Sequence, residues 1–284
     1  MSSVAAVIVN WNSGGLLEAC LASVHQAGNL AEILVIDNAS DDGSTRCLGR
    51  FGGRMLLLRN PVNRGFAAAV NQGFEATSSS YVLLLNPDVQ VLRGSAERLQ
   101  HFLDAHPRAG AVGGYAGEKY LPKRSSTVWS LIRENLGVPQ ARVYAPETLN
   151  GRTALEADQP AAAALMIRRD AYRDAGPFDE RFYPAWYEDV DFCRRLKMKG
   201  WQIYFAPGAE FLHRGGYSAE RLGLAKFLRM YYSNQLRYAR KHFGPAGAAA
   251  VRASIAAGMV GRMVSRPFQV RAYAETFIAA LRQW

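Results

Sequence analysis

The chain alternates between short, continuous apolar runs and longer stretches in which apolar residues recur every three or four positions. Helical spacing marks residues 16–24, 65–77 and 95–106, and Ser13 stands where it can cap the first of these helices. The continuous runs have the length of strands that are covered on both faces: residues 4–10, 32–37, 54–59 and 81–86. This alternation predicts right-handed crossovers and an α/β fold with a mainly parallel sheet.

The second half of the chain is less regular. We expect a helix at residues 188–200 and strands at residues 111–114, 161–169 and 201–205. Residues 115–160 show little periodicity, which predicts a long irregular segment. A segment of that length inside a compact domain more often has a functional role than none.

The charge of the chain is unevenly distributed. The 284 residues carry a formal net charge of +10. Residues 217–284 hold eleven Lys and Arg against only Glu220 and Glu275, whereas residues 1–216 hold 23 basic and 22 acidic residues. This shift marks a boundary near residue 217 and predicts an anionic partner for the C-terminal part. A nucleic-acid-binding protein should expose basic residues on its body as well, and the nearly neutral body argues against that class.

Several features bear on the compartment. The cysteines, Cys20, Cys47 and Cys193, are widely spaced and odd in number, so they fit neither a disulfide framework nor a zinc site. Reduced thiols are expected, as in a cytoplasmic protein. The N-terminal residues enter a strand pattern directly and lack the basic region of a signal peptide. No run of about eighteen uncharged apolar residues occurs, so we expect no transmembrane helix.

Polar side chains lie at the ends of predicted strands, at Asn10, Asp37 and Asp88. The carboxyl ends of parallel strands share the edge where open α/β sheets bind ligands. The glycine-rich dinucleotide fingerprint, the P-loop and the nucleophile elbow are absent from the sequence. A nucleotide is still a natural ligand, because Asp37 can accept a hydrogen bond from a pyrimidine ring N–H. The alternative is that Asp37 and Asp88 are solvated turn residues, since Asn, Pro and Asp are ordinary turn formers.

Six segments resemble, in their order along the chain, the family 2 inverting glycosyltransferases, and among these the bacterial rhamnosyltransferase-type members. The segments run from residue 7 to residue 218 and read VIVNWNS, VIDNASDDGS, NRGFAAAVNQG, LLLNPDV, FDERFYPAWYEDVDFCRRLKMKGW and HRGGYS. The resemblance implies the GT-A fold, a Rossmann-like α/β domain that binds a nucleotide-sugar together with a divalent cation, Mg2+ or Mn2+. It also implies transfer of the sugar with inversion at the anomeric carbon.

With the charge boundary near residue 217, the chain divides into a GT-A catalytic domain, residues 1–216, as the resemblance implies, and a basic amphipathic helical tail, residues 217–284. The catalytic domain then has a nucleotide-sugar half of about 1–114 and an acceptor half of about 115–216. On a helical wheel of residues 221–243, the cations fall on one arc, opposite to the apolar side chains: Lys226, Arg229, Arg237, Arg240 and Lys241. This arc predicts attachment to an anionic membrane surface. The alternative is a helix that packs its apolar face on the catalytic domain and leaves the basic side in solvent.

The resemblance implies a donor site that begins with Asp37, the residue that reads the base. Arg64 matches a position where it can offset diphosphate charge, and Gly65 permits close backbone approach. The full set of positions matched to nucleotide-sugar binding is Val9, Asn10, Asn12, Asp37, Asn63, Arg64, Gly65, Asn71, Asn86 and Asp88.

A metal site is implied by the same resemblance. Asp88 matches the last acidic residue of the family's D-x-D motif, and a hard cation bridging two phosphate oxygens favours carboxylate ligands. Asn86 stands in place of the first acidic residue, which removes one negative charge and weakens the expectation of tight metal binding. His213 matches a downstream histidine that can complete the metal shell, with Gly215 and Gly216 allowing a loop to close. A lone histidine is otherwise more often structural than a ligand.

The acidic cluster at residues 188–191 is the expected catalytic centre. An inverting transfer needs a base that takes the proton of the acceptor hydroxyl, and the resemblance assigns this role to Asp189, with Glu188 in support. Acceptor contacts are expected of Trp186, Asp191 and Arg195, and the alternative role of Asp191 is to orient Arg195. The alternative is an ordinary helix start, because acidic residues are common in the first turn of helices.

Together these features predict an enzyme that transfers L-rhamnose from dTDP-L-rhamnose to a bacterial envelope glycan or a polyprenyl-diphosphate-linked acceptor. It is expected to be cytoplasmic and peripherally attached to the inner face of the membrane, with no nucleic acid as partner. Another donor, a UDP-hexose or UDP-galactofuranose, is the main alternative. A nucleotidyltransferase that makes the nucleotide-sugar is a further one, but it would need a lysine-bearing phosphate loop near the first strand, and NWNSGG has no lysine.

Overall fold

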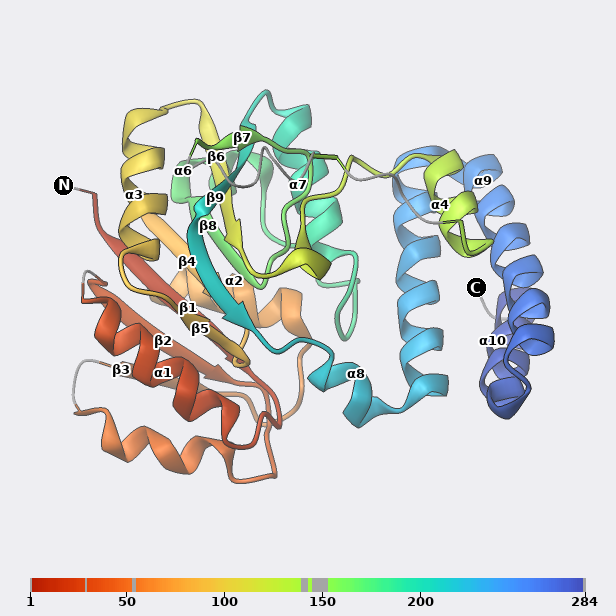
Figure 1. Ribbon diagram of the computed structural model, residues 1–284, viewed down its shortest axis with the longest axis horizontal. Coiled ribbons are helices and arrows are strands. Elements are labelled where there is room, and N and C mark those ends of the chain that lie inside the picture. The colour runs from red at the N-terminus through yellow and green to blue at the C-terminus, as the bar shows by residue number, and fades with distance from the viewer. Residues whose placement is uncertain (1, 29, 53–54, 139–142, 145–152, 283–284) are drawn as a thin grey trace.

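The computed structural model describes residues 2–28, 30–52, 55–138, 143–144 and 153–282. Figure 1 shows an α/β body and a helical extension beside it, with the C-terminus in the extension. The sheet order is β3-β2-β1-β4-β8-β6-β9-β5, with β7 paired to β9. The strands are β1 Val4–Asn10, β2 Glu32–Asp37, β3 Met55–Arg59, β4 Tyr81–Leu85, β5 Val89–Val91, β6 Ala109–Tyr115, β7 Leu155–Glu156, β8 Ala164–Arg168 and β9 Gln202–His213.

The first four strands of this order, β3, β2, β1 and β4, are parallel, as the alternating pattern predicts. β8 runs antiparallel to both β4 and β6, and β9 runs parallel to β6. The sheet is therefore mixed beyond its parallel half. Each predicted strand exists, and β9 extends to His213, well past the predicted end at residue 205.

Helices cover both faces of the sheet because the buried strands are apolar on both sides. On one face, Ile8 of β1 packs with α1 Leu16–Ala27 and α3 Ser95–Ala105. On the other, Val7 and Val9 pack with α2 Phe66–Ala76, α6 Arg169–Ala175 and α7 Glu188–Met198. Alternation of side chains along a strand places Ile8 and Val9 on opposite faces.

The predicted cap of the first helix is wrong. Gly15 occupies the N-cap of α1, and no side chain caps this helix. The Ser13 hydroxyl donates instead to Asn10 Oδ1 at the end of β1. Ser13 is almost completely buried, so its hydroxyl supports the strand-end network rather than the helix.

The predicted irregular segment at residues 115–160 contains regular structure. A short 3-10 turn, Glu118–Tyr120, is followed by α4 Val128–Asn135, whose Thr127 N-cap forms a capping box with Ser130. β7 then adds to the sheet edge at β9. Residues 139–142 and 145–152 of this segment lie outside the described residues.

The C-terminal region is helical: α8 Tyr217–Leu222, α9 Leu224–Ser265, a 3-10 turn Pro267–Gln269 and α10 Val270–Arg282. α9 is kinked at Gly244, which has φ of 71° and precedes Pro245. The part before the kink faces the body, and the part after it packs against α4 and α10 (Figure 1). A third apolar cluster joins α9 to α4 and to the segment before α7 through Leu131, Phe182, Tyr187, Leu236 and Ile255. The extension therefore shares a core with the body.

One feature differs from the expectation that no helix could cross a membrane. α9 meets the requirements of length and apolar composition for a membrane span, and 28% of the relevant window is buried inside the protein. The buried residues of α9 belong to an apolar cluster shared with α4, α10 and the body.

Candidate active site

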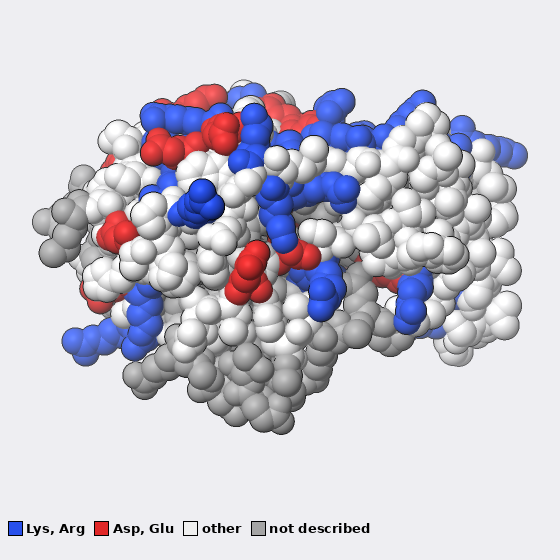
Figure 2. Space-filling model, turned by 90° about the horizontal axis from the view of Figure 1, so that it is seen from above, with Lys and Arg blue, Asp and Glu red and all other residues white. Residues whose placement is uncertain are grey.

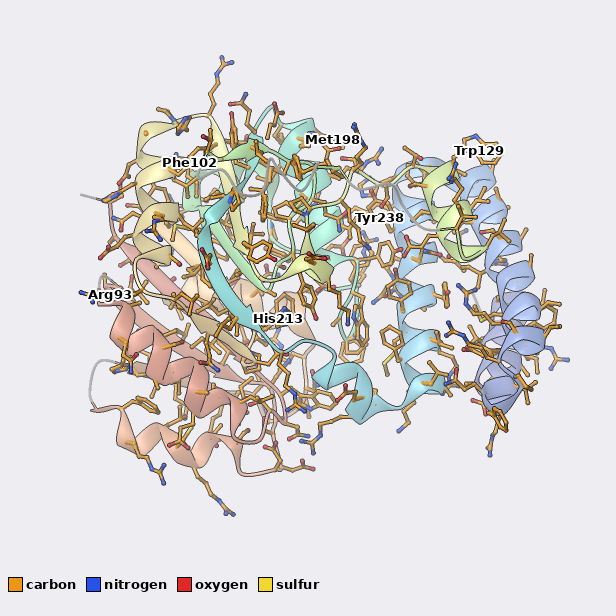
Figure 3. The ribbon with its side chains drawn as sticks, viewed as in Figure 1. Arg93, Phe102, Trp129, Met198, His213 and Tyr238 are labelled. Carbon is orange, nitrogen blue, oxygen red and sulfur yellow. The ribbon has the colours of Figure 1, made fainter. Side chains whose placement is uncertain are left out.

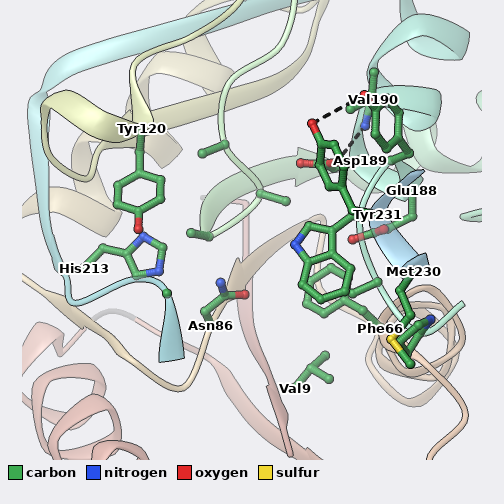
Figure 4. Close-up of a pocket in the computed structure, with 18 of the residues that line it drawn as sticks. Val9, Phe66, Asn86, Tyr120, Glu188, Asp189, Val190, His213, Met230 and Tyr231 are labelled. Carbon is green, nitrogen blue, oxygen red and sulfur yellow. Dashed lines mark hydrogen bonds between the residues drawn. The ribbon is translucent and has the colours of Figure 1, made fainter. Parts of the chain in front are cut away.

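A cavity of about 560 Å3 opens where β1 and β4 end, at the junction of the body and the extension. Figure 4 shows Tyr120, His213 and Asn86 on one side of it, and Glu188, Asp189 and Tyr231 on the other. The first group comes from the strand ends and the loops after them. The second group comes from α7 and α9. We call these two sides the donor wall and the acceptor wall, after the substrates that the resemblance to family 2 glycosyltransferases leads us to expect at each.

A hydrogen-bonded network of polar side chains lies behind the donor wall. Asn10 Nδ2 donates to Asp37 Oδ1 at 3.0 Å and to the hydroxyls of Ser40 and Ser44. Asn10 and Asp37 are buried neighbours in the register of β1 and β2. Neither lines the cavity, although Val9, the residue before Asn10, does. The network fixes the strand ends in place.

Asn38, which the sequence analysis passed over, lines the cavity next to Asp37. Its Nδ2 donates to Asn63 Oδ1 at 3.0 Å and to the Gly65 carbonyl at 3.1 Å. Its Oδ1 accepts from the backbone N–H of Arg64 at 3.0 Å. Asn38 therefore holds the 63–65 loop against the end of β2, and Asn63 lines the cavity beside it.

The remaining residues of the expected donor set have contacts within the protein. Asn71 is buried, and its amide bonds the backbone N–H and carbonyl of Phe178. Gly65, with φ of 86°, approaches the Tyr183–Pro184 segment, where a Cβ atom would lie 2.9 Å from the Tyr183 ring. Arg64 is half exposed and lies 3.9 Å from the Glu180 carboxylate. The structure thus uses Gly65 and Asn71 to join α2 to the segment that precedes α7.

Asn12 lies in the loop after β1 with a left-handed backbone, φ 49°. Its Oδ1 accepts from the Asp41 N–H at 2.8 Å. Its carbonyl accepts from Arg221 of α8 at 2.7 Å, and Arg221 also pairs with Asp42. The loop that follows β1 is thereby tied to the start of the C-terminal extension.

A tight turn presents Asp88. The Asn86 carbonyl accepts from the Val89 N–H at 3.1 Å, which closes a turn with Pro87 at the position that favours proline. Asn86 and Asp88 both line the cavity. The turn leads from β4 into β5, which pairs with the end of β9 and so brings Val89 opposite His213.

Asp88 and His213 lie side by side, with Asp88 Oδ1 3.2 Å from His213 Nε2. Asp88 Oδ2 accepts from the Gly215 N–H at 3.1 Å. His213 Nδ1 is buried and has no hydrogen-bond partner among the described residues. The Tyr120 ring covers the imidazole at 4.2 Å, and a Cβ atom at Gly215 would collide with the Tyr120 hydroxyl.

This pair fits two ligands of an open divalent-cation site. Asp88 Oδ1 and the His213 Nε2 that faces it are suitable donors to one Mg2+ or Mn2+, and further ligands would come from phosphate oxygens. The described residues contain no group of three or more His, Cys, Asp or Glu side chains placed to hold a metal by themselves.

The start of α7 is conformationally strained. Trp186 and Tyr187 have φ of 74° and 73°, a left-handed conformation that bulky residues rarely adopt. Asn234 of α9, itself fully buried, donates to the carbonyls of Tyr183 and Ala185. Gln235 donates to the Tyr187 hydroxyl at 2.8 Å. Helix α9 thus holds the strained segment that places the acidic residues at the cavity.

Glu188 and Asp189 both line the cavity at the N-terminus of α7. Burial raises the pKa of Asp189 above its usual value, and hydrogen bonds such as the one from the Val190 N–H at 2.8 Å oppose this shift. Burial also raises the pKa of Glu188, with a further contribution from the Asp189 charge. Glu188 is 5% exposed, and its Oε2 has no partner in the described part of the chain. The pKa is raised further at Glu188 than at Asp189, so Asp189 is the first of the two to lose its proton as the pH rises.

Asp191 and Arg195 do not reach the cavity, in contrast to their expected acceptor role. Asp191 is fully buried and accepts from His242 Nε2 at 2.7 Å and from Arg195 Nε at 2.8 Å. Lys241 Nζ lies 2.7 Å from the same carboxylate. Burial alone would raise the pKa of Asp191, but these partners hold it below its usual value. Arg195 also donates to three carbonyls at residues 175–177. Both residues connect α7 to its surroundings, and Asp191 connects it to α9.

The acceptor wall includes residues that the sequence analysis did not single out. Met230 and Tyr231 of α9 and Glu134 of α4 line the cavity beside Trp186. The Trp186 indole packs edge-on against Phe227 of α9, with ring centroids 5.0 Å apart. Figure 3 places Trp129, by contrast, at the outer end of α4, where it is 74% exposed. The amphipathic pattern of 221–243 was visible in the sequence, but its packing beside α7 was not.

Comparisons with known proteins agree on one family. Residues 5–176 match the family model described as Glycosyl transferase family 2. The chain is 29% identical over 267 residues to an N-acetylglucosaminyl-diphospho-decaprenol L-rhamnosyltransferase of Mycobacterium tuberculosis, and 84% of each chain is covered. It is 32% identical over 163 residues to a pre-mycofactocin glycosyltransferase of the same organism, which covers 55% of this chain and 32% of that protein.

A solved structure extends the agreement to the fold. A mannosyltransferase from Pyrobaculum calidifontis, in complex with GDP-Man and Mn2+, superposes with a TM-score of 0.58. The superposition covers 99% of this chain and 86% of that one at 18% sequence identity. The GT-A fold predicted from the resemblance is confirmed.

Proposed function

The chain belongs to glycosyl transferase family 2, and from this premise we propose that it is an inverting glycosyltransferase that transfers a sugar to a lipid-linked glycan. The observation that carries the proposal is the position of Asp189. Asp189 lines the same cavity as the strand-end residues Val9, Asn38 and Asp88. Figure 4 shows it across the cavity from Asn86 and His213. A base on one side of a cavity and a nucleotide site on the other is the arrangement that an inverting displacement requires.

The proposed step is a single displacement. The Asp189 carboxylate takes the proton of the acceptor hydroxyl while that oxygen forms a bond to the anomeric carbon. The bond from the anomeric carbon to the nucleoside diphosphate breaks on the opposite face, and the diphosphate leaves with the bonding electrons. The raised pKa of Asp189 makes its carboxylate a stronger base than an ordinary aspartate.

We assign the diphosphate end of the donor to Asp88 and His213. A divalent cation held there would neutralise charge on the leaving diphosphate. The 3.2 Å separation of His213 Nε2 and Asp88 Oδ1 supports this assignment, and the N–H of Gly215 orients the carboxylate. Asn63 and Asn86 line the same cavity, and we assign the ribose and the sugar of the donor to them.

The donor we propose is dTDP-L-rhamnose. The relative that matches 84% of this chain is named an L-rhamnosyltransferase, which supports rhamnose. A UDP-hexose or UDP-galactofuranose is the second candidate, because a galactofuranosyl glycosyltransferase of Leishmania donovani is 24% identical over 223 residues. The acceptor we propose carries a sugar on a polyprenyl diphosphate, the kind of molecule named for the rhamnosyltransferase relative.

We further propose that the extension attaches the enzyme to the cytoplasmic face of the membrane. The cationic arc expected on residues 221–243 is partly used inside the protein, because Lys241 pairs with Asp179 and Asp191. The outer end of the extension offers a better surface. It exposes apolar side chains at Val260, Val264, Phe268, Val270, Ile278 and Leu281, and arginines at 266, 271 and 282. Figure 2 shows mostly uncharged side chains over the extension, with Lys and Arg at its margins.

A donor panel tests the proposed function. The full-length protein would be incubated with dTDP-, UDP- and GDP-sugars, with and without excess chelator, and release of the nucleoside diphosphate would be followed. We expect turnover to be fastest with dTDP-L-rhamnose and to fall in chelator. A preference for another donor would correct the assignment of the sugar, and turnover of none of them, with or without acceptor, would contradict the proposed activity.

A further inference from the structure

We infer that helices α4 and α9 form a subsite for the sugar of the acceptor, with the Tyr231–Glu134 pair and Glu188 binding its hydroxyls and Lys123 pairing with its phosphate. This inference rests on the proposed function and adds residues that bind the second substrate. The family model ends at residue 176, so the wall built by α9 belongs to the part of the chain beyond that match.

Two side chains from distant segments meet in this wall. The Tyr231 hydroxyl donates to Glu134 Oε1 at 2.8 Å and lies 3.5 Å from the Tyr187 hydroxyl. Burial raises the pKa of Tyr231 well above its usual value, so its hydroxyl stays protonated. The apolar side chains of Met230 and Trp186 line the same cavity as this polar pair. A carboxylate and a phenol beside an indole form the usual combination for binding a pyranose, whose hydroxyls and C–H faces need both kinds of contact.

The carboxyl of Glu188 gives independent evidence for a bound ligand. Its carboxyl is almost completely buried in the cavity wall, yet Oε2 has no hydrogen-bond partner among the residues that the structure describes. An unsatisfied buried polar atom is costly and calls for an explanation. A hydroxyl of a bound sugar next to Asp189 would supply the missing partner.

Lys123 supplies positive charge at the same end of the cavity. Its side chain is exposed, lines the cavity and forms no ion pair with any carboxylate in the described ranges. It is close enough to Asp189 to lower the pKa of that carboxyl. If Lys123 only lowered the pKa of Asp189, it would make that carboxylate a weaker base. Beside a phosphorylated acceptor, Lys123 would instead bind the phosphate, which would offset part of its charge.

The test measures acceptor binding to the full-length protein by titration calorimetry in the presence of dTDP. One probe is N-acetylglucosamine on a short prenyl diphosphate, and the second is a neutral alkyl N-acetylglucosaminide. The variants are Tyr231→Phe and Lys123→Gln. The matched controls are Tyr232→Phe, on the same helix but outside the cavity wall, and Arg124→Gln, next to Lys123 and also outside it.

We expect Tyr231→Phe to lower the affinity for both probes about fivefold, because one hydrogen bond is lost. Lys123→Gln should weaken the diphosphate probe about tenfold and leave the neutral probe unchanged. Binding of dTDP should be the same in all variants. Unchanged binding of both probes by both variants, equal losses in the controls, or a wild-type protein that binds dTDP but neither probe would overturn the subsite. A wild-type protein that binds no nucleoside diphosphate would instead contradict the proposed function.

Discussion

The donor wall of the cavity is built from the ends of β1, β2 and β4, whereas the acceptor wall is built from α4, α7 and α9. Residues of the donor wall follow buried strands directly, and a network centred on Asn10 and Asn38 fixes them. Residues of the acceptor wall come from segments about 100 positions apart, as in the contact between Glu134 and Tyr231. The sheet therefore determines where the residues of the donor wall lie, whereas the packing of the extension against the body determines where those of the acceptor wall lie.

This difference suggests how one fold can keep its donor chemistry while its acceptor changes. The strand ends are rigid because apolar runs bury them on both faces. The acceptor wall depends on the position of α9, which Asn234 and Asp191 couple to the start of α7. A change in α9 should therefore alter acceptor binding and leave the donor site intact.

The largest effect is expected at Asp189, the residue of the acceptor wall proposed as the base. Asp189→Asn removes the base, so turnover should fall about 100-fold or more while nucleotide-sugar binding stays within a few-fold of wild type. Activity of the wild type should fall as the pH is lowered through the pKa of Asp189, because the protonated carboxyl cannot accept a proton. Since burial raises that pKa, the fall should begin at a higher pH than for an ordinary aspartate. Steady-state rates between pH 4 and 9 measure both effects. Full transferase activity in Asp189→Asn would exclude this residue as the base.

The next effect concerns the docking of the extension. Asp191→Asn removes the charge that binds His242, Lys241 and Arg195, and we expect the free energy of unfolding at pH 7 to fall by about 2 kcal/mol. The folded-state pKa of Asp191 is lowered, so this stabilisation is present above the pKa of the unfolded chain and is lost as the pH falls through the folded pKa. Urea titrations should therefore show a smaller difference between variant and wild type in acid.

A matched control is Asp170→Asn, which removes an exposed partner of Arg173 and should leave stability unchanged. Nucleotide binding should survive in Asp191→Asn, because the donor wall does not depend on α9. If the variant lost nucleotide binding as readily as acceptor binding, the two walls would not be separable in this way.

The order of the strands and helices of the body could be predicted from the sequence because buried parallel strands are continuous apolar runs. β1 and β2 lie at the predicted residues. It could not be predicted from the sequence which of Asp37 and Asn38 lines the cavity. Successive side chains of a strand point to opposite faces, and the pattern does not reveal which of them faces a ligand. Asp37 lies beside Asn10 in the register of β1 and β2, and its side chain joins the hydrogen-bonded network behind the donor wall. The Asn38 side chain lines the cavity instead.

The acidic cluster was recognisable, but the roles of its members were not. Asp189 and Asp191 are two positions apart, so a helix turns them about 200° away from each other. Asp189 therefore lines the cavity, and Asp191 faces α9. Helix α4 in the 115–160 segment could not be predicted from the sequence. The contact of Glu134 with Tyr231 could not be predicted either, because contacts between distant segments leave no periodic pattern.

A smaller effect is expected for the metal pair of the donor wall. Asp88→Ala and His213→Ala should each weaken binding of dTDP in the presence of Mn2+ about tenfold, and the double variant should lose little more than the worse single variant. Residues that serve one ion are not independent, because loss of either ligand weakens the same site. Calorimetry with Mn2+ and with chelator measures the effect, and His106→Ala, outside the cavity, is the control. Strictly additive losses, or full activity in excess chelator, would count against a shared cation.

The smallest effect is expected at the outer end of the extension, where it would meet the membrane. Deleting the extension cannot test this attachment, because Leu236, Ile255 and other residues of α9 belong to the core shared with α4 and the segment before α7. Point variants can. Phe268 is fully exposed at the turn between α9 and α10, close in sequence to Arg266 and Arg271. An exposed aromatic residue flanked by arginines is suited to the interface of an anionic bilayer.

We expect Phe268→Asp to lower co-sedimentation with anionic vesicles about three- to fivefold, because it removes apolar surface and adds a charge that the leaflet repels. Met198→Asp, at the exposed end of α7 in the body, makes the same kind of change away from the extension and should have little effect. Turnover of a water-soluble acceptor should stay at the wild-type level in both variants, since Phe268 lies outside the cavity wall. Transfer to an acceptor embedded in vesicles should fall with Phe268→Asp alone. Membrane attachment through the extension would be contradicted by equal binding of the two variants to anionic vesicles. It would also be contradicted if wild-type binding did not depend on salt or lipid charge.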